Sequence, residues 1–386
     1  MTTITGVDVL TVSLPFRFSF GHALAERKDS TNVFVRLRLS DGSVGYGEGV
    51  PREYVTGETV DGALEALIER QVPLVLGRSF DDPDDLPALV DDIPGSAPDG
   101  SLDTAARCAL ELAVLDAAGK SFGLSVAHWL GGTPSAKVRY DAVLPFSSPR
   151  KVGALAVVIR ALGVKQVKAK VGGDLEKEAR SLRVLRRMLG SGADIRVDAN
   201  CAWSADEALV AIERLREFRL SSVEQPVPGD DLDGLRRITE ATPEGIIVDE
   251  SLRTLDEART LAETKCCDAF NIRVSKCGGM LTSIRIADVA REAGLFCVVG
   301  AQVGESGILS AAGRHVAAQI QPRYVEGSGG RFLLKEDVTA ENMVPGRRGL
   351  AKTPTGPGLG VTVQEDVLER LGQVHRTFEA EAVKTG

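Results

Sequence analysis

The first forty residues alternate apolar and polar side chains, as half-buried β-strands do. This alternation runs through residues 4–16 and 32–40, and Asp41-Gly42 supplies a turn before a third short run at 44–47. We expect these three segments to form an antiparallel meander. Residues 17–31 between the first two strands are polar, and we interpret them as a mobile loop and a candidate lid.

The apolar period then changes to three or four residues, which is typical of helices. It does so over residues 60–76 and again over 102–122, a segment rich in strong helix formers. Strands followed by helices predict an α+β domain. We place its end at the Gly131-Gly132 break and assign it residues 1–132.

From residue 138 onward, short β-branched runs alternate with helical segments. The runs are VRYDAVLPF, QVKAKVG, DIRVDAN, SSVEQP, IIVDES, AFNIRVSK, FCVVGAQ and RYVEG, and the helical segments include 174–189, 205–217, 254–263 and 281–293. Eight strands with crossover helices predict an α/β fold, a parallel TIM-type (β/α) barrel, over residues 133–330. The remainder, 331–386, is rich in Pro and Gly and ends in a short helix. Since a closed barrel has no place for a further strand, we expect this segment to pack back on the N-terminal domain.

Composition narrows the function classes. The 386 residues suit a barrel plus an accessory domain, and no stretch is long and apolar enough to cross a bilayer. The N-terminus lacks the order of a secretory signal, so we expect a cytoplasmic protein. A net charge of −8 argues against a nucleic-acid partner and favours a small-molecule substrate. Six cysteines lie in apolar segments without C-x-x-C spacing, as buried reduced thiols do: Cys108, Cys201, Cys266, Cys267, Cys277 and Cys297.

Charged residues fall where the predicted barrel strands end. Lys170, Asp198, Glu224, Asp249 and Lys276 each close a β-run, and consecutive members are separated by roughly one βα unit. The carboxyl ends of barrel strands share one mouth, where barrel enzymes keep their active sites. We therefore expect these five side chains to converge.

Asp198, Glu224 and Asp249 would bring three carboxylates together from consecutive strands. Crowded carboxylates repel one another unless a cation holds them, and an all-oxygen set favours Mg²⁺ over Zn²⁺. A single acid at such a position commonly caps a helix or pairs with a surface base. Three acids at the barrel period indicate a metal site instead.

Lys168 and Lys170 project from the same side of one strand, and two ammonium groups beside a dication should lower a lysine pKa toward that of a general base. Lys276 lies four strands further around a ring of eight and so faces Lys170 across the mouth. A planar intermediate between them is open to protonation from either side. Removing a proton α to a carboxylate gives an enediolate, which a bound divalent metal stabilises as a Lewis acid.

These residues resemble the enolase superfamily and, within it, the muconate lactonizing enzyme subgroup. The similarity covers nearly the whole chain, and the motifs that carry it are Val167-Lys168-Ala169-Lys170, Val197-Asp198-Ala199-Asn200, Glu224-Gln225-Pro226, Asp249-Glu250-Ser251, Ser275-Lys276 with Gly278-Gly279, and the helix and link at 115–120 and 130–132. The resemblance implies an enolase-like, modified barrel with a Mg²⁺ site under an N-terminal capping domain. Because relatives of this kind are commonly dimers or octamers, it also implies a homo-oligomer.

Smaller signals concern the substrate. Asn200 and Glu305 resemble positions near the substrate in this subgroup, and Glu326 ends strand eight, where dipeptide epimerases carry a D-x-D that grips the substrate ammonium. Here Tyr324 replaces the first aspartate, which argues against a free dipeptide. In the capping domain, the segments 47–51 and 55–59 are similar to the dipeptide-epimerase loop. The candidate specificity residues there are Arg27, Arg52 and Tyr54, with His22 a weaker one.

The leading hypothesis is an isomerase that racemises or epimerises an N-acyl amino acid or dipeptide-like substrate, with Lys170 and Lys276 as the two acid/base groups. The same motifs also permit cycloisomerisation of a muconate-type diacid, or a syn-dehydration such as o-succinylbenzoate synthesis. A non-catalytic binding protein is a further alternative, which the intact Lys168, Lys170 and Lys276 disfavour.

Overall fold

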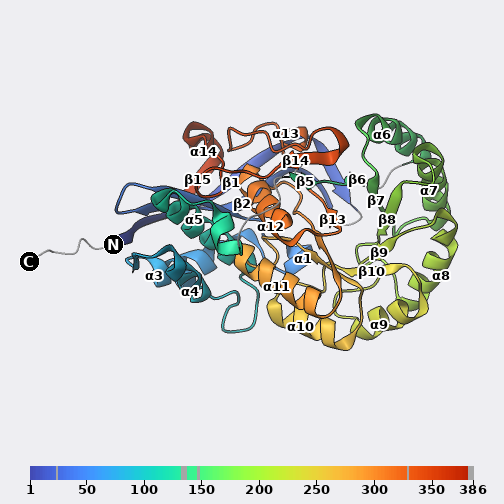
Figure 1. Ribbon diagram of the computed structural model, residues 1–386, viewed down its shortest axis with the longest axis horizontal. Helices are drawn as coiled ribbons and strands as arrows, with labels where there is room; N and C mark the ends of the chain where they lie inside the picture. Colours follow the sequence, from blue (N-terminus) through green and yellow to red (C-terminus); the bar gives the residue numbers. More distant parts are fainter. Residues whose placement is uncertain (23–24, 132–136, 146–147, 328–329, 381–386) are drawn as a thin grey trace, which may run out of the picture.

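The chain folds into a barrel flanked by an N-terminal sheet and its helices, with the N-terminus on the side away from the barrel (Figure 1). The computed structural model describes residues 1–22, 25–131, 137–145, 148–327 and 330–380, with side chains at all of these except 19–22 and 25–27. Within these residues, no helix has the length and apolar character needed to cross a membrane.

The predicted meander is confirmed. β1 (Thr2–His22), β2 (Ala25–Leu39) and β3 (Val44–Gly49) pair antiparallel in that order. The prediction of a loop at 17–31 is wrong. The β1–β2 pairing is irregular just after Pro15, but it then resumes and pairs Phe20 with Arg27. Phe16, Phe18 and Phe20 continue the apolar alternation into this extension, and the loop prediction did not take them into account. The side chains of His22 and Arg27 lie outside the described part of the chain.

Both helices predicted in this domain are present. The first spans α2 (Val60–Glu65), a π-helical turn (Ala66–Gln71) and α3 (Val72–Val75), and the second is α5 (Thr104–Phe122). The glycines of β3 let α5 pack closely on the sheet, since a Cβ at Gly47 would lie 1.8 Å from the Ala109 carbonyl oxygen. The smaller elements are α1 (Glu53–Thr56), β4 (Ser79–Phe80) and α4 (Leu86–Asp91).

The predicted eight-stranded parallel barrel is also confirmed. Its strands follow chain order: β6 (Ala142–Leu144), β7 (Gln166–Lys170), β8 (Asp194–Asp198), β9 (Ser222–Glu224), β10 (Gly245–Val248), β11 (Ala269–Ile272), β12 (Phe296–Val299) and β13 (Tyr324–Val325). A hydrogen bond of 2.8 Å from the Asp141 amide to the Val325 carbonyl links the two ends of the sheet. Outside lie α6 (Pro149–Leu162), α7 (Leu175–Leu189), α8 (Ala205–Leu215), α9 (Leu232–Ala241), α10 (Leu255–Thr264), α11 (Met280–Glu292) and α12 (Gly307–Ile320).

Three elements differ from expectation. The first predicted strand splits, because β5 (Lys137–Arg139) leaves the barrel to pair with β14 (Leu350–Lys352). The predicted run through Lys276 stops at Ile272, so that Lys276 lies in a turn. The C-terminal helix α14 (Glu365–Leu371) is followed by an unforeseen strand, β15 (Gly372–Glu379), which extends the N-terminal sheet beside β1. This strand is mostly exposed and lacks the apolar alternation that would have identified it. The domain limits at 132 and 330 stay predictions.

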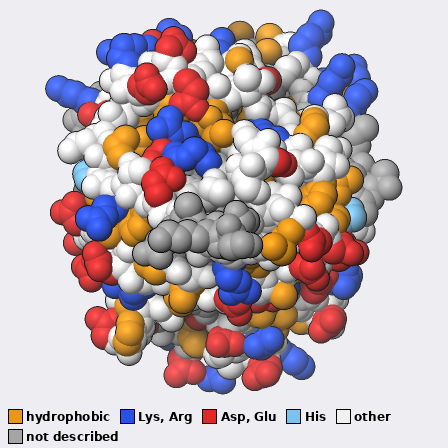
Figure 2. Space-filling model, turned by 90° about the vertical axis from the view of Figure 1, so that its left-hand side faces the viewer, with side chains coloured by type: hydrophobic (Ala, Val, Ile, Leu, Met, Phe, Trp, Pro, Cys, Tyr) orange, Lys and Arg blue, Asp and Glu red, His pale blue; other side chains and the backbone are white. Residues whose placement is uncertain are grey.

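Among the described residues, the buried apolar side chains form two large cores and one small cluster. One large core joins the N-terminal sheet to α5, and another lies between the barrel strands and their outer helices. Inside the barrel, a small cluster comprises Ile247, Ala269, Val298 and Tyr324. On the face shown in Figure 2, basic and acidic side chains are interspersed.

Candidate active site

The three predicted metal-binding carboxylates lie at the same end of neighbouring strands. Asp198 and Glu224 are register partners at the ends of β8 and β9, and Asp249 directly follows β10. All three are fully buried. No group of three or more His, Cys, Asp or Glu side chains in the described ranges has an arrangement that would already hold a metal ion, and lysine and arginine side chains contact the three acids instead.

Lys168 lies at the centre of these contacts. Its Nζ is 2.9 Å from Glu224 Oε1, 3.1 Å from Asp198 Oδ2 and 2.6 Å from Glu326 Oε2. Burial disfavours the ammonium, but the charges of Glu224, Glu326 and Asp198 outweigh burial and raise the pKa of Lys168 above its usual range. The lowering of a lysine pKa that we expected applies beside a bound dication, and it stays a prediction.

Lys170 is partly exposed and faces the mouth. Its Nζ donates to Asp198 Oδ2 at 2.6 Å and to Asn200 Oδ1 at 2.5 Å. Asn200 in turn donates from Nδ2 to Glu250 Oε1 at 3.2 Å and from its backbone amide to Asp198 Oδ1 at 3.0 Å. The Lys170 ammonium is therefore oriented by two neighbouring oxygen atoms.

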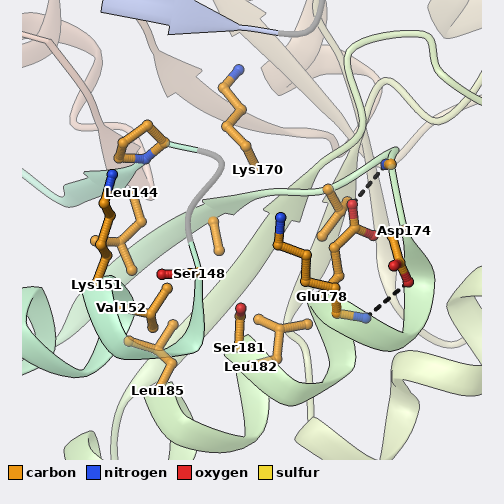
Figure 3. Close-up of a pocket in the computed structure, with 15 residues that line it drawn as sticks. Leu144, Ser148, Lys151, Val152, Lys170, Asp174, Glu178, Ser181, Leu182 and Leu185 are labelled. Atoms are coloured by element: carbon orange, nitrogen blue, oxygen red, sulfur yellow. Dashed lines mark hydrogen bonds between the residues drawn. The ribbon is translucent and has the colours of Figure 1, made fainter.

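Figure 3 shows a cavity of about 420 Å³ between α6 and α7, with Lys170 among the residues that line it. That cavity is lined by apolar side chains such as Leu144 and Leu182 and by the polar Ser148 and Lys151. Ala169, Lys170 and Val171 at the end of β7 all line this cavity, and the Lys170 side chain extends away from the other labelled side chains in Figure 3. The cavity therefore adjoins the end of β7 that carries Lys170.

Lys276 reaches the cluster from the opposite side of the ring. Its Nζ donates to Asp249 Oδ1 at 2.7 Å, to the Asp249 carbonyl at 2.5 Å and to the Asn271 carbonyl at 2.9 Å. Arg273 Nη2 also donates to Asp249 Oδ2. β7, which ends in Lys170, and β11, which precedes Lys276, lie four places apart among the eight strands. The two lysines therefore flank the carboxylates from opposite sides.

Carboxyl groups outnumber the cationic side chains in this cluster. The contacts link five cations to six carboxylates: Lys168, Lys170, Arg196, Arg273 and Lys276 with Asp141, Asp198, Glu224, Asp249, Glu250 and Glu326. Burial, followed by the charge of Asp198, raises the pKa of Glu224 to about 8. A divalent cation at this point would offset the repulsion among the carboxylates and favour the ionised form of Glu224. The oxygen-only donor set of Asp198, Glu224 and Asp249 is the kind that Mg²⁺ prefers.

Glu326 is engaged by two cations, since it contacts both Lys168 and Arg196. Arg196 also pairs with Asp141 Oδ2 at 2.6 Å and lies 4.3 Å from the centre of the Tyr324 ring. Tyr324 is buried inside the barrel, where its hydroxyl donates to Asp194 Oδ2 at 2.9 Å. The tyrosine that replaces the D-x-D aspartate is thus part of the barrel interior.

The capping-loop candidates have varied surroundings. Arg52 is buried and donates to the Pro51 carbonyl at 2.7 Å and to the Val303 carbonyl at 3.0 Å, which ties its loop to the segment after β12. Tyr54 is half-buried on α1. Glu305 accepts from the Gln302 amide at 2.5 Å, and burial raises its pKa to about 8. The Arg52 side chain therefore connects the capping loop to the barrel.

Sequence reasoning missed two buried residues that orient the cluster. Asn271 donates to Glu224 Oε1 at 2.9 Å, and Arg273 contacts Asp249 and also donates to Gln302 Oε1 at 3.0 Å. A signal was present, because these two polar residues are spaced by two in an otherwise apolar run and so face the same side.

The histidines have local partners. His315 is buried and contacts the Leu359 carbonyl at 3.1 Å, and burial lowers its pKa to about 4. His128 lies 2.9 Å from Asp84, and His375 lies 2.9 Å from Thr11 Oγ1. These contacts give all three histidines partners outside the carboxylate cluster.

Comparison with known families accounts for both parts of this architecture. Residues 1–131 match the family described as "Mandelate racemase / muconate lactonizing enzyme, N-terminal domain", and residues 151–367 match "Enolase C-terminal domain-like". The chain belongs to the enolase superfamily. The family inferred from the strand-end motifs is confirmed, and with it the assignment of this chain as an enzyme.

Three relatives bear on the activity of this enolase-superfamily chain. N-succinyl-L-Arg/Lys racemase of Bacillus cereus is 29% identical over 370 residues, which cover 95% of this chain and 97% of the relative. Its crystal structure matches with a TM-score of 0.88 at 27% identity, over 98% of this chain and 100% of that one.

The other two are solved complexes. A dipeptide epimerase from Enterococcus faecalis V583, complexed with Mg and the dipeptide L-Leu-L-Tyr, matches with a TM-score of 0.84 at 28% identity, over 93% of this chain and 99% of that one. A muconate lactonizing enzyme from Pseudomonas fluorescens, complexed with muconolactone, matches with a TM-score of 0.87 at 28% identity, over 96% and 100%. Racemase, epimerase and cycloisomerase thus share this fold.

Proposed function

We propose that this protein is a Mg²⁺-dependent isomerase that inverts the carbon next to a substrate carboxylate, acting on an N-acyl amino acid or a dipeptide-like acid. One observation carries the proposal: Lys170 and Lys276 approach the carboxylate cluster from opposite sides of the barrel ring. Inversion needs an acid/base group on each face of the reacting carbon, whereas a single group suffices for most other reactions of an enolate.

Asp198, Glu224 and Asp249 are the residues proposed to hold the metal. When bound there, Mg²⁺ would supply Lewis-acid stabilisation of the charge that develops on the substrate carboxylate. The buried, oxygen-only donor set and the raised pKa of Glu224 support this assignment. So does the Mg present in the related dipeptide epimerase complex.

The remaining steps belong to the chain's own side chains. Either lysine, as the free amine, takes the α-proton that faces it, and the other lysine, as the ammonium, delivers a proton to the opposite face. Lys168 holds Glu224 and Asp198 together through its Nζ. We propose Arg27, Arg52, Tyr54, Asn200, Glu305 and Glu326 as residues that bind or orient the substrate. A cytoplasmic homo-oligomer also remains our prediction.

Cycloisomerisation of a muconate-type diacid is the second candidate, and the close match to the Pseudomonas fluorescens enzyme favours it. In that reaction one lysine protonates an enolate and the other is not needed as a base. Because this chain places an amine on each side, racemisation or epimerisation is the better-supported function.

The deciding experiment is an NMR screen in D₂O with Mg²⁺. The acids are both enantiomers of N-succinyl-arginine and N-succinyl-lysine, L-Leu-L-Tyr and its epimer, and cis,cis-muconate. We expect α-proton exchange with inversion for an amino-acid derivative. Lysine-to-alanine changes at 170 and 276 should each abolish inversion while retaining exchange on opposite enantiomers. Lactone formation without exchange in the amino-acid series would favour the cycloisomerase, and no reaction with any of these acids would contradict both functions.

A further inference from the structure

The turn that carries Lys276 lies against the capping domain. After β11 the chain runs through Arg273 and Lys276 to Gly278 and Gly279, whose φ angles are +79° and +120°. These left-handed conformations favour glycine and let the chain reverse into α11. The whole turn is buried. The location of the Lys276 ammonium therefore depends on what packs against this turn.

Helix α11 begins without a cap of its own. Its N-cap residue is Gly279, which has no side chain to accept from the first-turn amides. The carboxylate of Glu111, on α5 of the capping domain, takes that role, because it accepts from the Leu281 amide at 3.0 Å and from the Met280 amide. Glu111 is fully buried. A Cβ at Gly279 would lie 2.2 Å from Glu111 Oε2, so glycine is required for this approach.

Arg107, one helical turn before Glu111, holds the same turn from its other side. Its Nη1 donates to the Gly278 carbonyl, to Thr282 Oγ1 at 3.0 Å and to Glu111 Oε2 at 3.1 Å. Arg107 is itself anchored, since its Nε donates to the Ile93 carbonyl at 2.9 Å. The ion pair thus bridges the two glycines and the first turn of α11.

A second capping-domain element contacts this segment. The backbone amide of Val50, just after β3, donates to Ser275 Oγ at 2.8 Å, and Ser275 directly precedes Lys276. Lys170 is held differently, because it ends a strand paired on both sides within the barrel. A change at the α5 contact should therefore reach one lysine and spare the other.

We infer that Glu111, oriented by Arg107, is a positioning residue that fixes the Lys276 ammonium by capping α11 from the capping domain. The inference rests on the proposed function only for the role of Lys276 in proton transfer. The mechanical part, that Glu111 orders the turn 273–279, stands independently of it.

The first test compares Glu111→Gln with a matched control, Asp116→Asn. Asp116 is a buried carboxylate on the same helix that accepts from the Tyr46 and Leu359 amides, so the control also removes one buried charge from α5. Each protein is incubated in D₂O with Mg²⁺ and each enantiomer of N-succinyl-arginine. Lys276→Ala shows which enantiomer Lys276 deprotonates.

We expect Glu111→Gln to slow α-proton exchange of that enantiomer by about 10- to 100-fold, the loss that follows from displacing a reacting group by up to about 1 Å. Exchange of the other enantiomer, served by Lys170, should change less than about 3-fold on the same reasoning. Asp116→Asn should leave the ratio of the two rates unchanged. Equal slowing of both enantiomers in Glu111→Gln, or no slowing, would overturn the inference.

The second test needs no substrate. Amide hydrogen exchange followed by mass spectrometry should show faster exchange in the peptide covering 273–283 in Glu111→Gln, and wild-type protection there in Asp116→Asn. Unchanged protection in Glu111→Gln would refute the positioning role even if the enzyme were inactive on every acid tried. Conversely, loss of protection in Glu111→Gln, together with no α-proton exchange by the wild-type protein on any acid tried, would uphold the positioning role and contradict the proposed function.

Discussion

Replacing Arg196 with methionine should destabilise the barrel more than a typical surface substitution does. Arg196 is 1% exposed and joins two buried carboxylates, Asp141 and Glu326, across the barrel interior. Methionine has a similar length and retains contact with the Tyr324 ring, but it leaves both acids without this cation. Lys168 still neutralises Glu326 at 2.6 Å, so the main loss falls on Asp141.

The size of the effect follows from the buried charges. Removing one partner of a buried ion pair costs about 3–5 kcal/mol, because the remaining charge is neither solvated nor paired. Burial already raises the pKa of Asp141 to about 7 against the opposing charge of Arg196. With Arg196 gone, Asp141 should therefore be protonated at neutral pH, which places the cost toward the lower end of that range. For cooperative unfolding of this chain, it corresponds to a fall of about 4–6 °C in the thermal midpoint.

The assay is urea unfolding at pH 7, followed by circular dichroism, with calorimetry for the midpoint. The matched control is Arg237→Met, which removes an ion pair of 2.6 Å with Asp206 at an exposed site. Exposed pairs contribute about 0–1 kcal/mol, so the control should unfold close to wild type. If Arg196→Met lost less than about 1 kcal/mol, the interior pair would be no stronger than a surface one and the reasoning would be refuted.

Three further predictions follow from the same contacts. Gly279→Ala places a Cβ against the Glu111 carboxylate at a φ of +120° and should reproduce the one-sided loss of α-proton exchange, whereas Gly192→Ala, with no atom within 4 Å of its added Cβ, should not. Burial raises the pKa of Glu48 from 4.5 to about 7, so the folded chain holds this proton more tightly than the unfolded chain. Relative to Glu48→Gln, wild-type stability should therefore fall by up to about 3 kcal/mol as pH rises from about 4.5 to 7 and then level off, and a flat difference in urea titrations would contradict this. Mg²⁺ at a hundred times its dissociation constant should stabilise the wild type by about 2.7 kcal/mol and Asp198→Asn far less, and EDTA should reverse the shift in the calorimetric midpoint.

The strand-end positions could be predicted because barrel geometry imposes a period on the sequence. A charged residue every βα unit has one place to go, and Asp198 and Glu224 indeed close adjacent strands as register partners. Lys276 lies on the predicted side of the ring although it is four residues beyond the end of β11. The βα repeat determines which strand precedes Lys276, and this does not depend on where that strand ends. The βα period was therefore sufficient to predict that these side chains come together, but it did not predict the turn that carries Lys276.

What stayed hidden depends on contacts between distant segments. Arg196 occupies an interior strand position at which the apolar pattern predicts an aliphatic residue, and its partners Asp141 and Glu326 come from the two ends of the sheet. The pKa of Lys168 depends on Glu326 in the same way. β15 is an exposed strand with one paired edge, so neither burial nor alternation marks it in the sequence. These pairings join segments that are far apart in the sequence, so they cannot be predicted from local sequence patterns.

The capping domain does more than cover the barrel mouth. Glu111 accepts from the first amides of α11, and Glu48 accepts from the Ser306 and Leu309 amides at the start of α12, with distances between 2.9 and 3.2 Å. Both carboxylates are fully buried, so separating the domains would leave these charges and helix amides without their partners. Since α11 and α12 directly follow the segments that carry Lys276 and Glu305, the order of this half of the mouth depends on docking of the capping domain. The half that carries Lys170 takes its order from the barrel ladder itself.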